Sequence, residues 1–210
     1  FAIAMRIKGE TAEELLGFLD AVDARLPALD HDTPVVVLPS YNGARKLPNL
    51  TPLLALALAR EGVPVLVHGL PEDPGRVTSA EVFAAFGLEA LPELSQAPAR
   101  WREGLPAFVS LPVLHPALAR LLAVRRVLGL RNSGHTLAKL LRVLPRGRAL
   151  RVVNHTHPEY AGSLSDYLQR DGADAVLMRG TEGEPVADAR RAGRLDVFLA
   201  GQAMPSLSLT

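Results

Sequence analysis

Residues 35–52 read VVVLPSYNGARKLPNLTP, and this stretch decides the expected fold. It begins with four apolar residues, three of them valine, which favour a buried strand. It continues through a polar loop to Thr51-Pro52, which predicts an N-cap at Thr51 followed by proline at the first helical position. A strand, a loop and a helix in this order form the repeating unit of an α/β fold.

The same alternation recurs along the chain. Further strands are expected at Val63–Val67, Ala107–Leu111, Leu150–Val153 and Ala175–Met178, with helices at Thr51–Glu61, Ser79–Phe86, Pro116–Leu128 and Ser163–Arg170. We therefore predict an α/β fold with a mainly parallel sheet flanked by helices. The segment 96–103, rich in Ala and Pro, is expected to be a mobile loop.

The first 32 residues contain no strand pattern. A helix ending near Gly9 is expected first, and Thr11-Ala-Glu-Glu14 has the form of a capping box that opens a second helix. We interpret residues 1–32 as the remnant of a small helical domain and residues 33–210 as the α/β domain. Because the chain starts inside a helix and stops after an apolar stretch, we expect it to be truncated at both ends.

Composition narrows the class of protein. With 210 residues, 48% of them apolar, the chain can bury a sizeable core. No apolar run approaches the ~18 residues that span a bilayer, so no membrane partner is expected. The absence of cysteine excludes disulfides and cysteine catalysis. No signal peptide is visible, which predicts a cytoplasmic protein.

Positive charge is concentrated in one part of the chain. The whole protein has 23 basic and 22 acidic residues, yet no Asp or Glu lies between Glu103 and Glu159. The basic residues of this span are Arg120, Arg125, Arg126, Arg131, Lys139, Arg142, Arg146, Arg148 and Arg151. Such a concentration favours phosphate ligands even at low net charge. The alternative is a solvated basic surface without a ligand.

A helix is expected within this span, over residues 132–144. At 100° per residue, cationic groups fall on one side of it, within a sector about 80° wide. They are Arg131, His135, Lys139 and Arg142, with Leu137, Leu140, Leu141 and Leu144 on the opposite side. We expect the leucines to face the core and the cations to form an exposed ridge. An anionic partner would relieve the repulsion along that ridge.

The loop after the first strand is a candidate phosphate site. In parallel α/β sheets, ligands bind where the carboxyl ends of strands meet helix N-termini. The loop offers small polar donors, a flexible glycine and two cations, and His68 ends the next strand at the same edge. The candidate residues are Ser40, Tyr41, Asn42, Gly43, Arg45, Lys46, Asn49, Thr51 and His68. An ordinary polar turn is the alternative at this position.

Several segments together resemble a known family. They include PSYNGARK at 39–46, LGLRNSGHTLAKL at 128–140 and GADAVLMRGTEGE at 172–184. In this order they resemble the anthranilate phosphoribosyltransferase group of glycosyltransferase family 3, and within it the YbiB-like branch of DNA-binding homologues. The resemblance implies a helical domain plus an α/β domain, in a homodimer.

Departures from the family pattern weigh against its transfer reaction. The enzymes carry GTGGD, which wraps the pyrophosphate of phosphoribosyl pyrophosphate, where this chain has Ser40-Tyr-Asn-Gly-Ala44. The family's KHGN is reduced to His68-Gly69 without the lysine. The adjacent Asp-Glu pair that binds magnesium becomes Glu182-Gly-Glu184, which predicts a poorer Mg²⁺ site. An active anthranilate phosphoribosyltransferase is therefore not expected.

Two functions remain open. The first is sequence-independent, phosphate-directed binding of single-stranded or duplex DNA or RNA, without a cofactor, a metal or catalytic residues. Its predicted binding residues are Arg125, Arg126, Arg131, His135, Lys139 and Arg142. The second is a phosphoribosyltransferase that uses phosphoribosyl pyrophosphate and an aromatic or anionic acceptor. Mg²⁺ is expected only in this second case.

Overall fold

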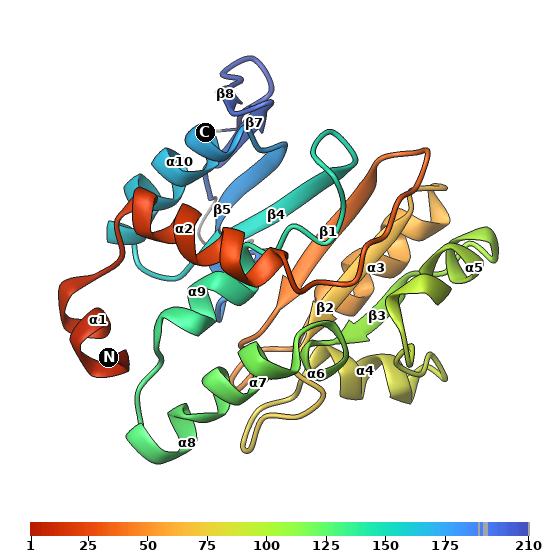
Figure 1. The fold of residues 1–210 in the computed structure, drawn as a ribbon. Helices are drawn as coiled ribbons and strands as arrows, with labels where there is room; N and C mark the ends of the chain where they lie inside the picture. Colours follow the sequence, from red (N-terminus) through yellow and green to blue (C-terminus); the bar gives the residue numbers. More distant parts are fainter. Residues whose placement is uncertain (189, 191–192, 210) are drawn as a thin grey trace.

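A computed structural model of the chain describes residues 1–188, 190 and 193–209. A single sheet runs through the centre of the molecule, with helices on both sides of it (Figure 1). Its strands are β1 (Val35–Ser40), β2 (Val65–Gly69), β3 (Ala107–Ser110), β4 (Ala149–His155), β5 (Ala175–Thr181), β6 (Glu184–Ala187), β7 (Leu195–Leu199) and β8 (Gln202–Ala203). The predicted α/β fold with a mainly parallel sheet is confirmed.

The order of strands across the sheet is β3-β2-β1-β4-β5-β7-β8. The five strands from β3 to β5 pair in parallel, and they are the five that the apolar segments predict. β5 pairs antiparallel with both β6 and β7, and β7 pairs antiparallel with β8. These last three strands were not predicted. β5 and β6 form a tight hairpin, and its turn places residues 182–184 at the carboxyl edge of the parallel strands.

Two of the described helices precede the first strand, and the others connect the successive parallel strands. They are α1 (Ala2–Lys8), α2 (Ala12–Asp23), α3 (Thr51–Arg60), α4 (Ser79–Ala85), α5 (Ala97–Arg102), α6 (Leu111–Leu114), α7 (Pro116–Ala123), α8 (Arg125–Leu128), α9 (Ser133–Lys139) and α10 (Glu159–Asp171), with a 3₁₀ turn at Leu94–Gln96. None of the helices described is long and apolar enough to cross a membrane.

Two apolar layers hold the helices to the sheet. On one face, Leu38, Val65 and Val67 pack with Ala55 of α3 and Phe83 of α4. The larger layer on the other face joins inward-facing strand residues to α2, α7, α9 and α10. Alternate residues of β1 contribute to opposite layers, as the two-residue period of a strand requires. Both layers leave the carboxyl edge of the sheet to polar loops.

The N-terminal helices pack on the larger layer. The capping box at Thr11 and Glu14 is confirmed, because each residue's side chain accepts a hydrogen bond from the other's backbone N–H. Leu15 and Leu19 of α2 are buried in the same core as the sheet residues. The division of the chain into residues 1–32 and 33–210 stays a prediction.

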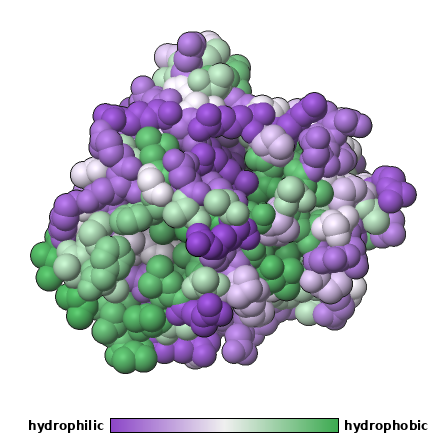
Figure 2. All heavy atoms as spheres, in the orientation of Figure 1, coloured by the Kyte–Doolittle hydropathy of each residue, from purple (hydrophilic) through white to green (hydrophobic). Residues whose placement is uncertain are grey.

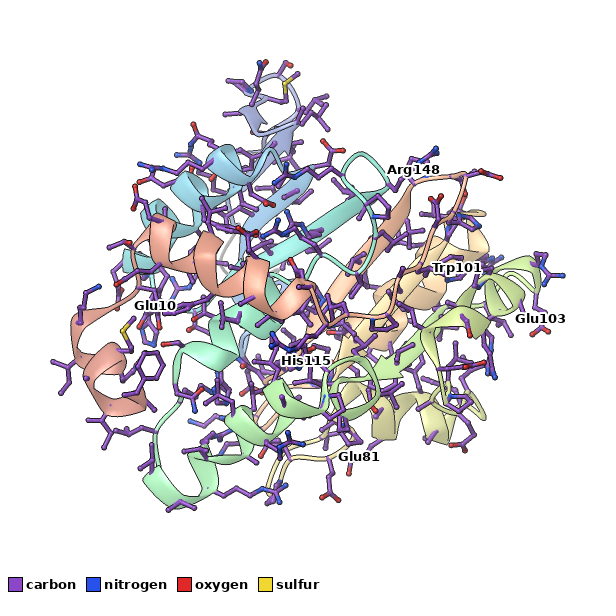
Figure 3. The ribbon with its side chains drawn as sticks, in the orientation of Figure 1. Glu10, Glu81, Trp101, Glu103, His115 and Arg148 are labelled. Carbon is purple, nitrogen blue, oxygen red and sulfur yellow. The ribbon has the colours of Figure 1, made fainter. Side chains whose placement is uncertain are left out.

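The expected mobile loop at 96–103 is a helix instead, and that expectation is wrong. α5 occupies this segment, and the Trp101 indole donates a hydrogen bond of 2.8 Å to the Val65 carbonyl (Figure 3). Ala97 is fully buried. The alanines and prolines that suggested a loop serve here as a short helix with proline in its first turn.

Candidate functional site

The loop that follows β1 lies at the carboxyl edge of the sheet, beside the end of β2. Strand register pairs Pro39 with His68 and Ser40 with Gly69. At this point the backbones are very close, since a Cβ on Gly69 would lie 1.9 Å from the Ser40 carbonyl oxygen. The loop and the end of β2 therefore form one continuous edge, as the sequence predicts.

A carboxylate from a distant part of the chain occupies the centre of this loop. Glu184, at the start of β6, is 2% exposed. Its Oε1 accepts hydrogen bonds from the backbone N–H groups of Asn42, at 2.8 Å, and Gly43, at 2.7 Å. Its Oε2 accepts from the hydroxyls of Ser40 and, at 3.2 Å, Thr51. Both oxygens are thus bound by groups of the predicted phosphate loop.

The Thr51 hydroxyl is used for this contact and not for capping. The N-cap of α3 is Leu50, and Thr51 is the first residue of the helix. Asn49 supports the turn, because its Oδ1 accepts from the Thr51 N–H at 3.2 Å and its Nδ2 donates to Ser79 Oγ at 3.2 Å. The prediction of Thr51 as N-cap is therefore off by one residue.

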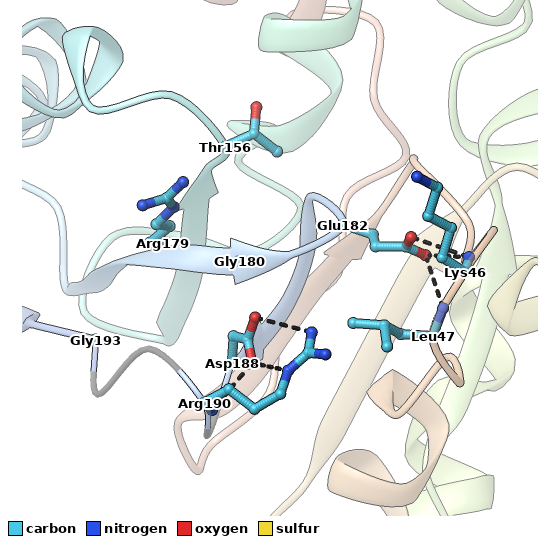
Figure 4. A pocket seen from close by; sticks show the side chains of 9 residues that line it. All are labelled: Lys46, Leu47, Thr156, Arg179, Gly180, Glu182, Asp188, Arg190 and Gly193. Atoms are coloured by element: carbon cyan, nitrogen blue, oxygen red, sulfur yellow. Dashed lines mark hydrogen bonds and ion pairs between the residues drawn. The ribbon is translucent and has the colours of Figure 1, made fainter.

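A second carboxylate is bound further along the same loop. Glu182 accepts hydrogen bonds from the backbone N–H groups of Arg45, at 2.6 Å, of Lys46 and of Leu47 (Figure 4). Burial acts to raise the pKa of Glu182, but these three donors outweigh it and lower the pKa. The hairpin around Gly183 thus presents two anions to one loop.

His68 lies directly beneath the loop and does not reach solvent. It is fully buried, and its Nδ1 lies 2.7 Å from the Tyr41 hydroxyl. Burial lowers the pKa of His68 to about 3, so the ring is neutral at pH 7. His68 and Tyr41 thus lie at the predicted edge of the sheet, but both side chains are buried and are not accessible to a ligand in this conformation.

The expected basic ridge is not exposed. α9 ends at Lys139, earlier than predicted, and His135 is 6% exposed. Lys139 turns towards the carboxyl edge, where its Nζ donates to Asn154 Oδ1 at 2.9 Å and to the Gly183 carbonyl at 3.1 Å. Burial lowers the pKa of Lys139 to about 8, and Glu184 partly opposes this effect. The prediction of an exposed ridge is wrong because α9 packs against α7, the two N-terminal helices and β1.

Other basic residues of the acid-free span form ion pairs with Asp and Glu residues from other segments of the chain. Arg142 Nε lies 2.7 Å from Asp23 and 3.5 Å from Asp171, and its Nη2 lies 2.8 Å from Asp20. Arg125 pairs with Asp73 at 2.9 Å. The remaining pairs join Arg126 to Glu72 and both Arg146 and Arg151 to Asp171. A span without acids in the sequence is therefore largely neutralised in space.

A different set of cations remains available at the carboxyl edge. These side chains are Arg45, Lys46, Arg131 and Arg179, and within the described ranges none of them makes a hydrogen bond or an ion pair. Arg45, Lys46 and Arg179 are exposed. Arg131 is partly buried and is influenced by the charges of Glu184 and Arg76. Burial lowers the pKa of Arg131 to about 10, so it remains charged at pH 7.

Two cavities open near this edge. One, of about 370 Å³, is lined by Lys46, Thr156, Arg179 and Glu182, with Asp188 and Arg190 opposite (Figure 4). The other, of about 390 Å³, lies between the loop after β2 and α7, with apolar walls that include Leu70 and Leu122. Arg125 and His135 also line this second cavity. The sequence did not single out Arg179, whose exposure at the end of β5 depends on strand register.

The residues at the edge do not fit a magnesium ion. Among the residues whose placement is described, no group of three or more His, Asp or Glu side chains could hold a metal. Glu182 and Glu184 already accept N–H and O–H donors, and Lys139 lies against the Gly183 carbonyl between them. Mg²⁺ needs anionic oxygens that are free to meet it at close, octahedral distances. In this conformation the hairpin does not supply them.

Solved structures share the arrangement of strands and helices described above. A crystal structure of anthranilate phosphoribosyltransferase from Thermus thermophilus superposes with a TM-score of 0.77 at 25% identity, over 100% of this chain and 62% of that one. The chain has the fold of anthranilate phosphoribosyltransferase. The Saccharomyces cerevisiae enzyme, solved in complex with phosphoribosyl pyrophosphate and Mg, gives a TM-score of 0.71 at 17% identity, over 100% and 58% of the two chains.

Curated relatives of the chain agree with this fold. The chain is 43% identical over 200 residues to the uncharacterized protein YbiB of Escherichia coli K12, covering 93% of this chain and 62% of that protein. It is 30% identical over 185 residues to anthranilate phosphoribosyltransferase of Anaeromyxobacter sp. strain Fw109-5, covering 87% of this chain and 54% of that enzyme. The chain thus spans only part of the length of the relatives it matches. No protein-family model matches it.

Proposed function

We propose that this protein binds nucleic acid through its phosphates, without dependence on sequence, at the carboxyl edge of the sheet. One observation carries the proposal: the acids of this edge are bound by internal partners, whereas four cations are not. Glu182 and Glu184 accept donors from the loop, and Asp73 pairs with Arg125. At this edge, the cations whose side chains have no partner among the described residues are Arg45, Lys46, Arg131 and Arg179.

Charge and spacing at this edge suit a polyanion. The unpaired cations come from the loop after β1, from the segment before α9 and from the end of β5, so they extend along the edge. Phosphate groups repeat along a nucleic-acid strand, and each cation that meets one releases condensed counterions. Contacts to phosphates orient the strand but do not read bases. The predicted residues Arg125, Arg126 and Arg142 are held by acids, so we assign them a smaller part.

Phosphoribosyl transfer is the second candidate. It is favoured by the shared fold and by the donor groups of the loop, which converge on an anion as a diphosphate site requires. The yeast enzyme of this fold is solved with phosphoribosyl pyrophosphate and Mg. Against this candidate stands Glu184, because its carboxylate takes the position where a diphosphate would meet those donors.

A paired titration separates the two functions. Fluorescent single-stranded DNA is titrated with the protein at several salt concentrations, and phosphoribosyl pyrophosphate is titrated by calorimetry with and without Mg²⁺. We expect DNA binding that weakens steeply with salt and no Mg²⁺-dependent binding of phosphoribosyl pyrophosphate. The reverse pattern would reject the nucleic-acid proposal and favour the transferase.

We further expect a homodimer, formed through α1 and the segment around α8. Figure 2 shows apolar side chains gathered at the lower left of the molecule, where Figure 1 places α1 and α8. The exposed apolar residues there are Phe1, Ile3, Ile7, Val127 and Leu130. An apolar patch of this kind marks an interaction surface. Light scattering of wild type and of Ile7→Asp combined with Val127→Asp tests it: the variant should be monomeric, and a monomeric wild type would contradict the expectation.

A further inference from the structure

The loop after β1 is built as an anion site and already contains an anion. Two backbone N–H groups and two hydroxyls converge on the Glu184 carboxylate, and Ser79 Oγ lies 2.7 Å from Ser40 Oγ in a second layer. Backbone N–H groups and hydroxyls in this arrangement are the donors with which loops bind phosphate oxygens. The donors are neutral, so their complement is a group with several acceptor oxygens and negative charge.

Positive charge from outside the loop strengthens the site. Burial lowers the pKa of both Arg131 and Lys139, and both lie near enough to Glu184 for its charge to oppose this effect. Neither side chain forms an ion pair with the carboxylate among the described contacts. Both cations would act in the same way on a phosphate group at this position.

The turn of the hairpin between β5 and β6, which carries Glu184, is held in place by hydrogen bonds. The Asn42 side chain donates to the Glu182 carbonyl at 2.8 Å, and Lys139 donates to the Gly183 carbonyl at 3.1 Å. Gly183 has φ +85°, and a Cβ there would lie 1.4 Å from Asn42 Nδ2. Together with the N–H donors to Glu182, these contacts make the hairpin fit the loop at every residue of its turn.

We infer that Glu184 is an internal substitute for a phosphate group, and that the loop 40–51 is a phosphate site which the chain's own hairpin keeps closed. The ligand class is inorganic phosphate or diphosphate, or the same group on a larger molecule. This inference does not depend on nucleic-acid binding, because the exposed side chains of Arg45 and Lys46 are not among the donors to Glu184.

Substitution of Glu184 tests the inference directly. Glu184→Ala removes the carboxylate and leaves the donors, whereas Glu184→Gln keeps an amide oxygen in the same place. Inorganic pyrophosphate and inorganic phosphate, both without metal, are titrated into each protein by calorimetry and in thermal melts. We expect Glu184→Ala to bind pyrophosphate at least tenfold more tightly than wild type, and to melt several degrees higher in its presence. Wild type and Glu184→Gln should show no such response.

A further substitution locates the ligand. Adding Thr51→Val to Glu184→Ala removes one donor hydroxyl and should weaken pyrophosphate binding several-fold. A Glu184→Ala protein that folds but binds neither phosphate nor pyrophosphate would overturn the inference. Equal binding by wild type and Glu184→Ala would do so too, because the site would then not be closed by Glu184.

Measurements on wild type keep the inference testable if Glu184→Ala does not fold. The amide hydrogens of Asn42 and Gly43 should then be protected from exchange in wild type, and saturating pyrophosphate should leave their exchange rates and chemical shifts unchanged. Fast exchange of these two amides, or a pyrophosphate-induced shift at both, would contradict a site that Glu184 occupies.

Discussion

Arg142 is held by three aspartates from two helices. Asp20 and Asp23 belong to α2, and Asp171, whose side chain is inaccessible to solvent, ends α10. Arg151 pairs with the same Asp171 from β4. Because the carboxylates of Asp23 and Asp171 are largely removed from water, their cationic partners are required for stability and are not available to an external ligand.

Removal of Arg142 should therefore destabilise the protein. Arg142→Ala leaves the largely buried Asp23 without its cation and removes one of the three arginines around Asp171, so we expect the free energy of unfolding to fall by about 2–3 kcal/mol. Arg146→Ala is the matched control, since Arg146 is 64% exposed and should contribute less than about 1 kcal/mol. Urea unfolding of the three proteins measures both values. Similar losses for the two variants would show that Arg142 is no more than a surface contact.

Buried histidines should make the fold sensitive to acid. Burial lowers the pKa of His135 from 6.5 to about 4, and the nearby Arg131 lowers it further. Below pH 6.5 the unfolded chain takes up a proton that the folded ring resists, so stability falls as the pH drops from 6.5 to 4. The slope is about 1.4 kcal/mol per pH unit for one such group.

A variant isolates the contribution of His135. In His135→Gln this group cannot titrate, so the variant lacks this loss of stability in acid. The free energy of unfolding of the variant minus that of wild type should therefore rise by roughly 3 kcal/mol as the pH falls from 6.5 to 4. Chemical unfolding at several pH values gives the difference. If the free energies of unfolding of the two proteins differ by the same amount at every pH in that range, His135 has the same pKa in the folded and unfolded states.

At the scale of elements, the hairpin between β5 and β6 determines the site. It brings Glu182 and Glu184 more than a hundred residues along the chain to the loop after β1. Neither the hairpin nor this pairing could be predicted from the sequence, because register across a tight turn depends on contacts with the rest of the fold. The loop itself was predicted, since a strand, small polar residues and a helix start follow one another locally.

Gly183 is the residue on which this hairpin depends. Gly183→Ala would introduce a Cβ that overlaps Asn42 at a backbone conformation with φ +85°. We expect a loss of several kcal/mol, with displacement of the hairpin. Gly147→Ala is the control, because Gly147 has φ +75° but no atom within 4 Å of the added carbon; it should cost about 1 kcal/mol. Thermal melts distinguish these outcomes, and equal costs would indicate that the hairpin tip is not tightly packed.

α9 shows why periodicity misjudged exposure. The spacing of Leu137, Leu140 and Leu141 correctly predicted a buried side. The opposite side is also covered, because α9 is a short helix that lies against α7, the N-terminal helices and β1. Periodicity identifies which residues share a face, but only the packing of other elements determines whether that face meets solvent.

At the scale of the molecule, the arrangement of charge is the main difference from the sequence-based expectation. The five parallel strands and the α/β class followed from local patterns of apolar residues. The basic span did not remain a single surface: Arg148 precedes β4 at the amino edge of the sheet, far from the loop of the candidate site (Figure 3). In the folded protein the basic residues of this span lie at both the amino and the carboxyl edge of the sheet. Most of their ion-pair partners are the acidic residues within 20–23, 72–73 and 171.

The salt dependence of DNA binding tests the central claim most directly. In Arg45→Gln combined with Lys46→Gln, two unpaired cations are lost while the backbone donors to Glu182 remain. Arg60→Gln combined with Arg102→Gln is the control with the same charge change, because both residues end helices that lead into the amino edge of the sheet. The slope of log affinity against log salt should shrink by about 0.7 to 0.9 per lost phosphate contact in the first variant and stay unchanged in the control. Identical slopes and affinities in wild type and both variants would contradict nucleic-acid binding at the carboxyl edge.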